Sequence, residues 1–492
     1  MSKILFVNTT QWGRGLTPIW IASHNGLLKK NNHNTDIFDL NFYNSWQKNE
    51  VAFNTSNGQY KKVSARNPYK YNTKNIGISF IDKIIEYSPD IIIWSGVSSH
   101  IHGEGEFSSV ARGYEFVSKH LLSLKSKTMK IPIIATGGIE LMAHSKESLK
   151  KTYPDIDCFL LGDSEYLLLN LANIIDKKKE IPRFLDIRDI ERNRPNFKSG
   201  EYYYDYGIFE AQSFIRPYQG KYLKSVDYEL SRGCPFSCHY CVETIIQEFY
   251  SSRDYNKKGI IKSINQYYRK KEPQDVSEEL KHLNSLGIEF IRFQDTNFLS
   301  LGMNYLDKIS YYMSKYNLKG YIETRPETIT KSIVKVLNKL NIVGVGMGIE
   351  TASNSKRGEE LGRHCEDEKI IKAFDLLKKG NIRRTAYNMI GLPDEKPEDI
   401  VETIKFNRLL KPDDITCAFY TPYIGTTLSK SFKDETIDRG NLDPQLECPS
   451  ENAKSNPFYL KMKNLFCHLC KNDESLDFIP KLWKATVKEY SL

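Results

Sequence analysis

The sequence lacks the features that would direct it into a membrane or a secretory pathway. No apolar run approaches the ~20 residues that a helix needs to span a bilayer. The apolar start at residues 3–7 turns polar at Asn8, which is too early for a signal peptide. We therefore expect a soluble, cytoplasmic protein without a membrane partner.

The sequence also has little excess charge. Its 70 Lys and Arg residues against 61 Asp and Glu residues leave a net charge of +9 over 492 residues. The nearest approach to a basic stripe with interleaved aromatic residues is the short run 267–271, so we expect no nucleic-acid partner. Internal repeats and low-complexity tracts are absent, and a chain of this length predicts two to four domains of ~100–200 residues each.

The first third of the chain alternates short apolar runs with helical patterns. The apolar runs are residues 3–7, 36–40, 91–94, 131–135 and 158–161. Continuous apolar strands between helices are typical of a parallel sheet that is covered on both faces. We expect an α/β domain with a doubly wound, Rossmann-like parallel sheet over residues 1–175. A charged, aromatic connection without clear periodicity follows over residues 176–222.

Small and polar residues follow these strands, at Ser95-Gly96, Thr136-Gly137-Gly138 and Gly162-Asp163. In open α/β sheets, ligands bind beyond the carboxyl ends of the strands, so these residues are candidates for lining a ligand crevice. The alternative is that glycine and serine only terminate the strands.

A second series of strands and helices begins near residue 223. Its strands are predicted at 226–230, 289–293, 320–323, 342–349, 385–390 and 415–420. This rhythm is typical of a βα-barrel, and it predicts a partial (β/α)6, TIM-like barrel over residues 223–425 with functional residues at the carboxyl ends of its strands. Residues 426–492 are expected to form a small, mainly helical C-terminal region.

Three of the nine cysteines follow the first predicted barrel strand with the spacing C-x3-C-x2-C, at Cys234, Cys238 and Cys241. Three thiolates on one loop can bind three corners of a 4Fe–4S cluster and leave the fourth iron open to a small molecule. A structural zinc site is the alternative, for which Cys467 and Cys470 could supply a further pair. Clustered cysteines in a chain without a secretory signal indicate metal ligands more than disulfides.

At this point the sequence resembles the radical S-adenosylmethionine (radical SAM) superfamily. The resemblance covers residues 223–425, and beyond the cysteine loop it includes the strand-end segments 294–298, 323–326, 348–350 and 388–393. It implies a partial barrel whose cluster binds S-adenosylmethionine and cleaves it reductively. It also implies a reducing partner such as flavodoxin or ferredoxin, and a small-molecule substrate.

The resemblance also implies roles for residues at the strand ends. Tyr240 should lie near the adenine of S-adenosylmethionine, and Gly391 should flank it. Arg325 and Glu350 are expected to contact the ribose or the methionine moiety, with a barrel-rim ion pair as the alternative. Asp295 belongs to the same set of expected S-adenosylmethionine contacts.

The stretch 242–273 is longer than this resemblance leads us to expect. It could form a lid or a substrate wall. A surface insertion is the alternative, because loops tolerate extra length at little cost.

The order of the two domains resembles the cobalamin-binding radical SAM subfamily, in which loops at the sheet edge surround the corrin. The positions that this resemblance assigns to cobalamin are Ser95, Gly96, Val97, Ser98, Gly137, Gly138, Gly162 and Glu165. The D-x-H-x-x-G motif, whose histidine binds cobalt in cobalamin mutases, is absent. His100 and His102 lie near one crevice loop, where a cobalt or catalytic role competes with simple solvation.

The resemblance implies transfer of a methyl group, by way of cobalamin, from S-adenosylmethionine to an unactivated carbon or to phosphorus. Natural-product tailoring is the expected setting. The alternative is another radical reaction on the same scaffold, such as cyclisation, oxidation, ring contraction or epimerisation. A methylthiotransferase would need a second cysteine set in the N-terminal domain, where only Cys158 precedes Cys234. A zinc-bound interaction protein is the non-enzymatic alternative.

Overall fold

A computed structural model describes the chain from residue 1 to residue 489 with internal gaps. The ranges not described are 48–62, 64, 99–106, 109, 126–130, 192–202, 252–259, 262–263, 421–424, 432–456 and 490–492. His100 and His102 lie outside the described residues, as does part of the stretch 242–273.

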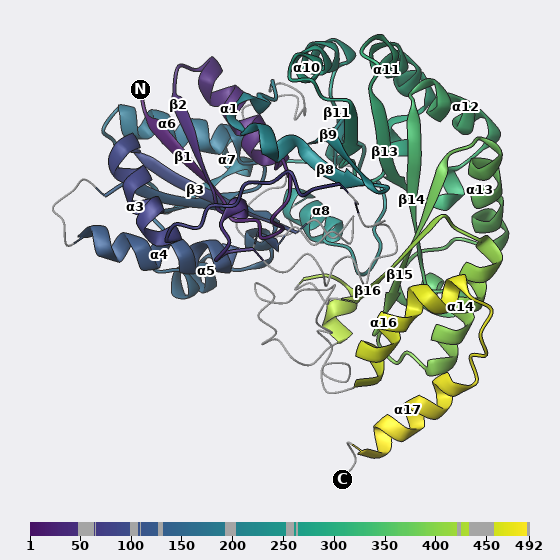
Figure 1. Cartoon of the computed structure of the whole chain (residues 1–492). Helices are drawn as coiled ribbons and strands as arrows, with labels where there is room; N and C mark the ends of the chain where they lie inside the picture. The colour runs from purple at the N-terminus through teal and green to yellow at the C-terminus, as the bar shows by residue number, and fades with distance from the viewer. Residues whose placement is uncertain are drawn as a thin grey trace.

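The N-terminal domain is built on a parallel sheet with strand order β2-β1-β3-β5-β6-β7, and the short strand β4 pairs antiparallel with β3 (Figure 1). The strands are β1 (Lys3–Asn8), β2 (Asn34–Asp39), β3 (Ile91–Ser98), β4 (Phe107–Ser108), β5 (Ile133–Gly138), β6 (Cys158–Leu161) and β7 (Phe184–Asp186). The order reverses between β1 and β3, which is the switch point at which doubly wound sheets bind ligands.

Helices cover both faces of this sheet (Figure 1). They are α1 (Ile19–Lys30), α3 (Ile76–Tyr87), α4 (Val110–Lys125), α5 (Lys146–Thr152), α6 (Glu165–Asp176) and the short α7 (Ile187–Glu191). Helix α1 packs against α6, and α3 packs against α4. The prediction of a doubly wound α/β domain is therefore confirmed.

The second sheet curls into an open barrel with strand order β16-β15-β14-β13-β12-β9-β8. Its parallel strands are β9 (Lys221–Tyr228), β12 (Phe290–Phe293), β13 (Lys319–Thr324), β14 (Ile342–Glu350), β15 (Arg383–Ile390) and β16 (Asp414–Phe419). The outer helices are α10 (Pro273–Ser285), α11 (Met303–Lys315), α12 (Lys331–Lys339), α13 (Asp367–Lys379) and α14 (Pro397–Leu410) (Figure 1). The six parallel strands confirm the predicted partial (β/α)6 barrel, to which β8 (Ile215–Tyr218) adds an antiparallel edge strand.

The C-terminal region is helical where it is described. Helix α16 (Pro457–Lys471) packs on β16 and α14, and α17 (Phe478–Glu489) packs on α14 (Figure 1). Across the described ranges, no helix combines the length and the apolar character that crossing a bilayer requires.

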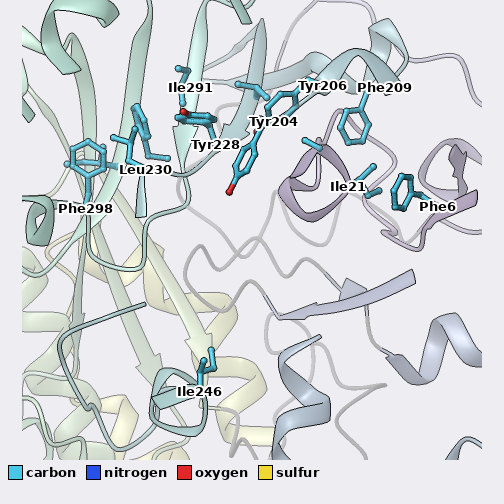
Figure 2. Packing of buried hydrophobic residues seen from close by; sticks show 14 of the residues in the cluster. Phe6, Ile21, Tyr204, Tyr206, Phe209, Tyr228, Leu230, Ile246, Ile291 and Phe298 are labelled. Carbon is cyan, nitrogen blue, oxygen red and sulfur yellow. The ribbon is translucent and has the colours of Figure 1, made fainter. Parts of the chain in front are cut away.

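The connection predicted over residues 176–222 contributes a strand to each sheet, β7 to the first and β8 to the second. Between them, Tyr204, Tyr206 and Phe209 join residues of α1 and β9 in one continuous hydrophobic core (Figure 2). Apolar burial therefore holds the two domains together, at roughly 25 cal/mol per Å² of surface removed from water.

Two close contacts fix α1 against the chain that follows the first sheet. A Cβ on Gly26 would lie 1.6 Å from the Tyr203 carbonyl oxygen, so only glycine allows this approach. The backbone N–H of Asp227 donates to the Thr17 hydroxyl (3.0 Å), and the Thr17 N–H donates to the Asp227 carboxylate (3.4 Å). These bonds tie the loop before α1 to the first barrel strand.

Candidate active site

The three cysteines of the C-x3-C-x2-C segment lie on a loop just beyond the carboxyl end of β9. Cys234 and Cys238 are buried, and Cys241 is half-buried. Gly233 precedes them with φ at +86°, and a Cβ there would lie 2.8 Å from the Tyr267 carbonyl oxygen. A side chain at this position would be strained and crowded, so glycine is required where the loop turns.

Hydrogen bonds from the Gln247 side chain and from the backbone hold the shape of this loop. The Gln247 amide, from α8 (Glu243–Ser251), donates to the carbonyl oxygens of Cys234 (2.8 Å) and Phe236 (2.9 Å). The His239 N–H donates to the Leu361 carbonyl oxygen at 2.9 Å. The loop is therefore anchored both to its own helix and to the segment beyond β14.

Burial raises the pKa of the Cys234 thiol to about 12, and it raises the pKa of Cys241 as well. Buried thiolates at this place need a compensating positive charge, which iron supplies when thiolates bind it. In the described parts of the chain, no three His, Cys, Asp or Glu side chains are grouped so that one metal ion could bind between them. Three thiolates of a cubane cluster bind three different irons, which is a different arrangement from a single-ion site.

Tyr240 and Glu350 meet in one buried network. The Tyr240 hydroxyl donates to Glu350 Oε1 at 3.0 Å, and the Arg363 guanidinium donates to the same oxygen at 2.8 Å. Burial raises the pKa of Glu350, while Arg363 acts in the opposite direction. Glu350 ends β14 with φ at +64°, a conformation that L side chains adopt mainly at turns and functional sites.

Sequence reasoning missed Arg363 as a functional residue. It reaches Glu350 from the far side of the turn Lys356–Glu360, and its second nitrogen donates to the Gly348 carbonyl oxygen at 2.8 Å. No local pattern marks a pairing between residues in two different turns.

Arg325 lies directly against the cysteine loop. Its guanidinium stacks 4.0 Å above the Phe236 ring, and NH1 approaches Cys238 Sγ at 3.6 Å. Its Nε bonds Glu327. Arg325 therefore places a cationic donor beside the cysteine loop.

Asp295 and Gly391 bond protein groups at their strand ends. The Asp295 carboxylate accepts from the Leu230 N–H (3.1 Å) and from the Ser231 hydroxyl (2.5 Å), and burial raises its pKa to about 7. The Gly391 N–H donates to Glu395 at 2.8 Å. Their expected contacts with S-adenosylmethionine stay predictions.

A cavity of about 270 Å³ lies between the two domains. Its N-terminal wall includes residues from the predicted cobalamin set. Its other wall includes the segment just before the first cysteine and residues that follow β12. From the predicted set it contains Ser95, Gly96, Gly138, Gly162 and Glu165, and from the barrel Ser231, Arg232, Gly233, Gln294 and Thr296. Gly137 is buried beside Ser164 and does not line the cavity, and the side chains of Val97 and Ser98 are not described.

Glu165, in the N-terminal wall of the cavity, accepts hydrogen bonds from two side chains. Its carboxylate accepts from Arg232 at 2.6 Å and from the Ser23 hydroxyl at 2.9 Å. Burial opposes its ionisation, but Arg232 and His24 outweigh burial, and the pKa of Glu165 lies below its ordinary value. Glu165 is therefore an ionised partner of the cysteine loop.

His24 and Thr10 also line the cavity, and sequence reasoning had singled out neither. The His24 ring bonds the Trp20 carbonyl oxygen (2.5 Å) and the Ser164 hydroxyl (3.0 Å), and burial lowers its pKa. The Thr10 hydroxyl is buried and has no hydrogen-bond partner in the described part of the protein. An orphaned hydroxyl in a cavity wall is available to a polar ligand group.

Cys448 lies outside the described residues, and the other cysteines beyond the loop lie in packed regions. Cys417 on β16 and Cys470 on α16 are buried, and the Cys467 thiol donates to the Ile415 carbonyl oxygen at 3.4 Å. Cys365 is also buried.

The three cysteines thus follow the first strand of an open parallel barrel. Residues 228–406 match the model of the Radical SAM superfamily. The barrel of this chain is a radical SAM domain.

Two curated relatives show how widely such chains differ in activity. An anaerobic magnesium-protoporphyrin IX monomethyl ester cyclase from Cereibacter sphaeroides is 22% identical over 380 residues, covering 72% of this chain and 55% of its own length. A tRNA-2-methylthio-N(6)-dimethylallyladenosine synthase from Clostridium botulinum is 22% identical over 373 residues, covering 72% of this chain and 74% of its own length. The match thus spans little more than half of the cyclase.

Both domains together resemble a solved structure. The radical S-adenosylmethionine methyltransferase TsrM from Kitasatospora setae, with cobalamin and a [4Fe-4S] cluster bound, superimposes with a TM-score of 0.61 at 15% identity. The match covers 87% of this chain and 78% of TsrM, so the two-domain fold is shared.

Proposed function

We propose that this chain is a cobalamin-dependent radical SAM enzyme that methylates an unactivated carbon, or phosphorus, of a small natural-product molecule. One observation carries the proposal. The segment Ser231–Gly233, which leads directly into the three cysteines, faces the glycine- and serine-bearing ends of the N-terminal strands across one cavity. The likeness to TsrM supports it, because that protein is a methyltransferase with cobalamin and a cluster bound.

Cys234, Cys238 and Cys241 would hold a 4Fe–4S cluster. The residues fit this group, because three thiols lie on one anchored loop and Arg325 approaches one of their sulfurs. When bound there, the cluster supplies an electron for the reductive cleavage of S-adenosylmethionine. The buried shell of the loop keeps water away from the sulfurs.

Tyr240, Glu350, Arg325, Asp295 and Gly391 would surround S-adenosylmethionine. The Tyr240–Glu350 bond places a carboxylate and an aromatic ring next to the loop. A carboxylate fits the hydroxyls of a ribose, and an aromatic ring fits the face of an adenine.

The wall formed by Ser95, Gly96, Gly138, Gly162 and Thr10 would receive cobalamin. Glycines allow a flat ligand to approach the backbone, and the orphaned Thr10 hydroxyl offers it a hydrogen bond. When bound, cobalamin supplies a cobalt centre that can carry a methyl group.

The test begins with anaerobic production in the presence of cobalamin and measurement of iron, sulfide and cobalt per chain. We expect about four irons, as in a 4Fe–4S cluster, together with one cobalt. Serine in place of Cys234, Cys238 or Cys241 should abolish iron binding, whereas Cys365→Ser, at a buried thiol outside the loop, should retain it. Iron without cobalt would refute the cobalamin assignment, and zinc in place of iron would refute the whole proposal.

A second candidate is a radical reaction without methyl transfer, and the likeness to a cyclase favours it. The mass of the product separates the two, because methylation adds one methyl group per turnover. Reduction by flavodoxin or ferredoxin is proposed for either reaction.

A further inference from the structure

Four charged side chains meet where the two domains touch. Asp163 and Glu165 come from the turn after β6. Arg232 and Arg269 come from a small antiparallel sheet of β10 (Ser231–Arg232) and β11 (Arg269–Lys270). Arg232 lies 2.6 Å from Glu165 and 3.6 Å from Asp163, and Arg269 bonds Asp163. These four side chains are called the interdomain charge cluster.

Arg232 connects the interdomain charge cluster to the cysteine loop, because it lies two residues before Cys234 in the sequence. Its Nε donates to Glu229 at 2.7 Å, and NH2 donates to Glu165 and to the Tyr204 hydroxyl (3.1 Å). A planar guanidinium held by two carboxylates has one orientation only. One carboxylate belongs to the barrel and the other to the N-terminal domain.

Glu165 is itself fixed by the N-terminal domain. It is the first residue of α6, its side chain is 2% exposed, and the Ser23 hydroxyl of α1 donates to it at 2.9 Å. The domain therefore presents a fixed negative charge to Arg232, two residues before Cys234. Ion pairs removed from water act more strongly than surface pairs.

We propose that Glu165 is a positioning residue for the cluster, which acts through Arg232 and makes the reduction of the cluster depend on the N-terminal domain. The inference rests on the proposed function, because it requires a cluster on the three cysteines. It assigns Glu165 a role other than the cobalamin contact expected from the sequence.

Replacing Glu165 and replacing Arg232 should shift the midpoint potential of the cluster in opposite directions. A reduced cluster carries one more negative charge than an oxidised one, so nearby positive charge favours reduction. Glu165→Gln leaves the Arg232 charge less compensated and should raise the midpoint potential. Arg232→Gln removes that positive charge and should lower it. A loss of structural support alone would move both variants in the same direction.

Asp186→Asn is the matched control. Asp186 forms a buried bidentate pair with Arg188 at 2.9 and 2.8 Å, and Arg188 NH1 donates to the Phe249 carbonyl oxygen on α8. This variant weakens another buried ion pair at the domain interface that does not touch the cysteine loop. Its potential should equal that of the wild type.

The experiment is an anaerobic redox titration of the reconstituted holoprotein, followed by electron paramagnetic resonance of the reduced cluster. Opposite shifts in Glu165→Gln and Arg232→Gln, with no shift in Asp186→Asn, would support the inference. Unshifted potentials, or shifts of one sign in all three variants, would overturn it. Wild-type protein that binds no iron–sulfur cluster would overturn the proposed function as well, so the two failures are distinguishable.

Arg232→Lys provides a rescue that does not depend on how well Arg232→Gln folds. Lysine keeps the charge but cannot bridge both carboxylates with a planar fork. Its potential should lie close to that of the wild type while Glu165→Gln remains raised. If the potential of Arg232→Lys were shifted as far as that of Glu165→Gln, in the same direction, only the bridging of the two carboxylates would matter. That result would overturn the electrostatic role.

Discussion

Glu395 should make the stability of the barrel depend on pH. Its carboxylate is buried after β15, and burial raises its pKa to about 8, against the opposing hydrogen bond from the Gly391 N–H. The folded-state pKa of Glu395 lies above the unfolded value of 4.5, so the folded protein holds the proton more tightly. The stability that the protonated carboxyl contributes is therefore complete below about pH 4.5 and is lost as the pH rises toward 8.

The size of this effect follows from the shift. One pKa unit corresponds to about 1.4 kcal/mol, so the ionisation of Glu395 in the unfolded chain lowers the free energy of unfolding by about 4 kcal/mol between pH 5 and pH 8. Glu395→Gln keeps an oxygen that can accept the Gly391 N–H but cannot ionise. The variant should therefore gain about 4 kcal/mol over the wild type across this interval.

The assay is urea unfolding of the metal-free protein at pH 5, 6.5 and 8. Glu398→Gln is the control, because it makes the same chemical change at an exposed position on the first turn of α14. Other titrating groups are common to all three proteins and cancel in the comparison. Parallel pH profiles for wild type and Glu395→Gln would refute the reasoning.

Three further substitutions test the geometry. Gly233→Ala should lower the iron content of reconstituted protein several-fold, because its Cβ would press on the Tyr267 carbonyl oxygen; wild-type iron content would contradict this. Arg363→Met should destabilise the fold by about 3–5 kcal/mol, because it leaves the buried Glu350 carboxylate without its cation, and unfolding at several pH values would measure it. Gly26→Ala in α1 should lower the free energy of unfolding by roughly 1–3 kcal/mol, because the added methyl group overpacks the contact with Tyr203. Alanine inside a helix ordinarily stabilises by about 1 kcal/mol relative to glycine, so a raised melting temperature would contradict this prediction.

The fold was largely predictable because its strands are continuous apolar runs with helices between them. Residues 91–94 and 158–161, for example, coincide with buried stretches of β3 and β6. The cysteine loop was predictable for a similar reason, since its three thiols are close together in the sequence.

The partners of that loop were not predictable from the sequence. Glu165 and Arg232 are separated by 67 positions and belong to different domains, so no periodicity links them. His24 lies on α1 and Thr10 follows β1, and only the tertiary fold brings both into the wall of the cavity. Local patterns identify elements, whereas tertiary packing determines which side chains meet.

The hydrogen bonds between Thr17 and Asp227 join residues 210 positions apart. At ~5–20 residues per second, a ribosome needs on the order of 10–40 s to travel that distance. During this interval the N-terminal sheet can form, and Asn41 and Trp46 can already bond the loop before α1, but Thr17 still lacks Asp227. The cavity between the two domains is thus completed only after the first barrel strand has left the ribosome, so the order of synthesis places its assembly late in folding.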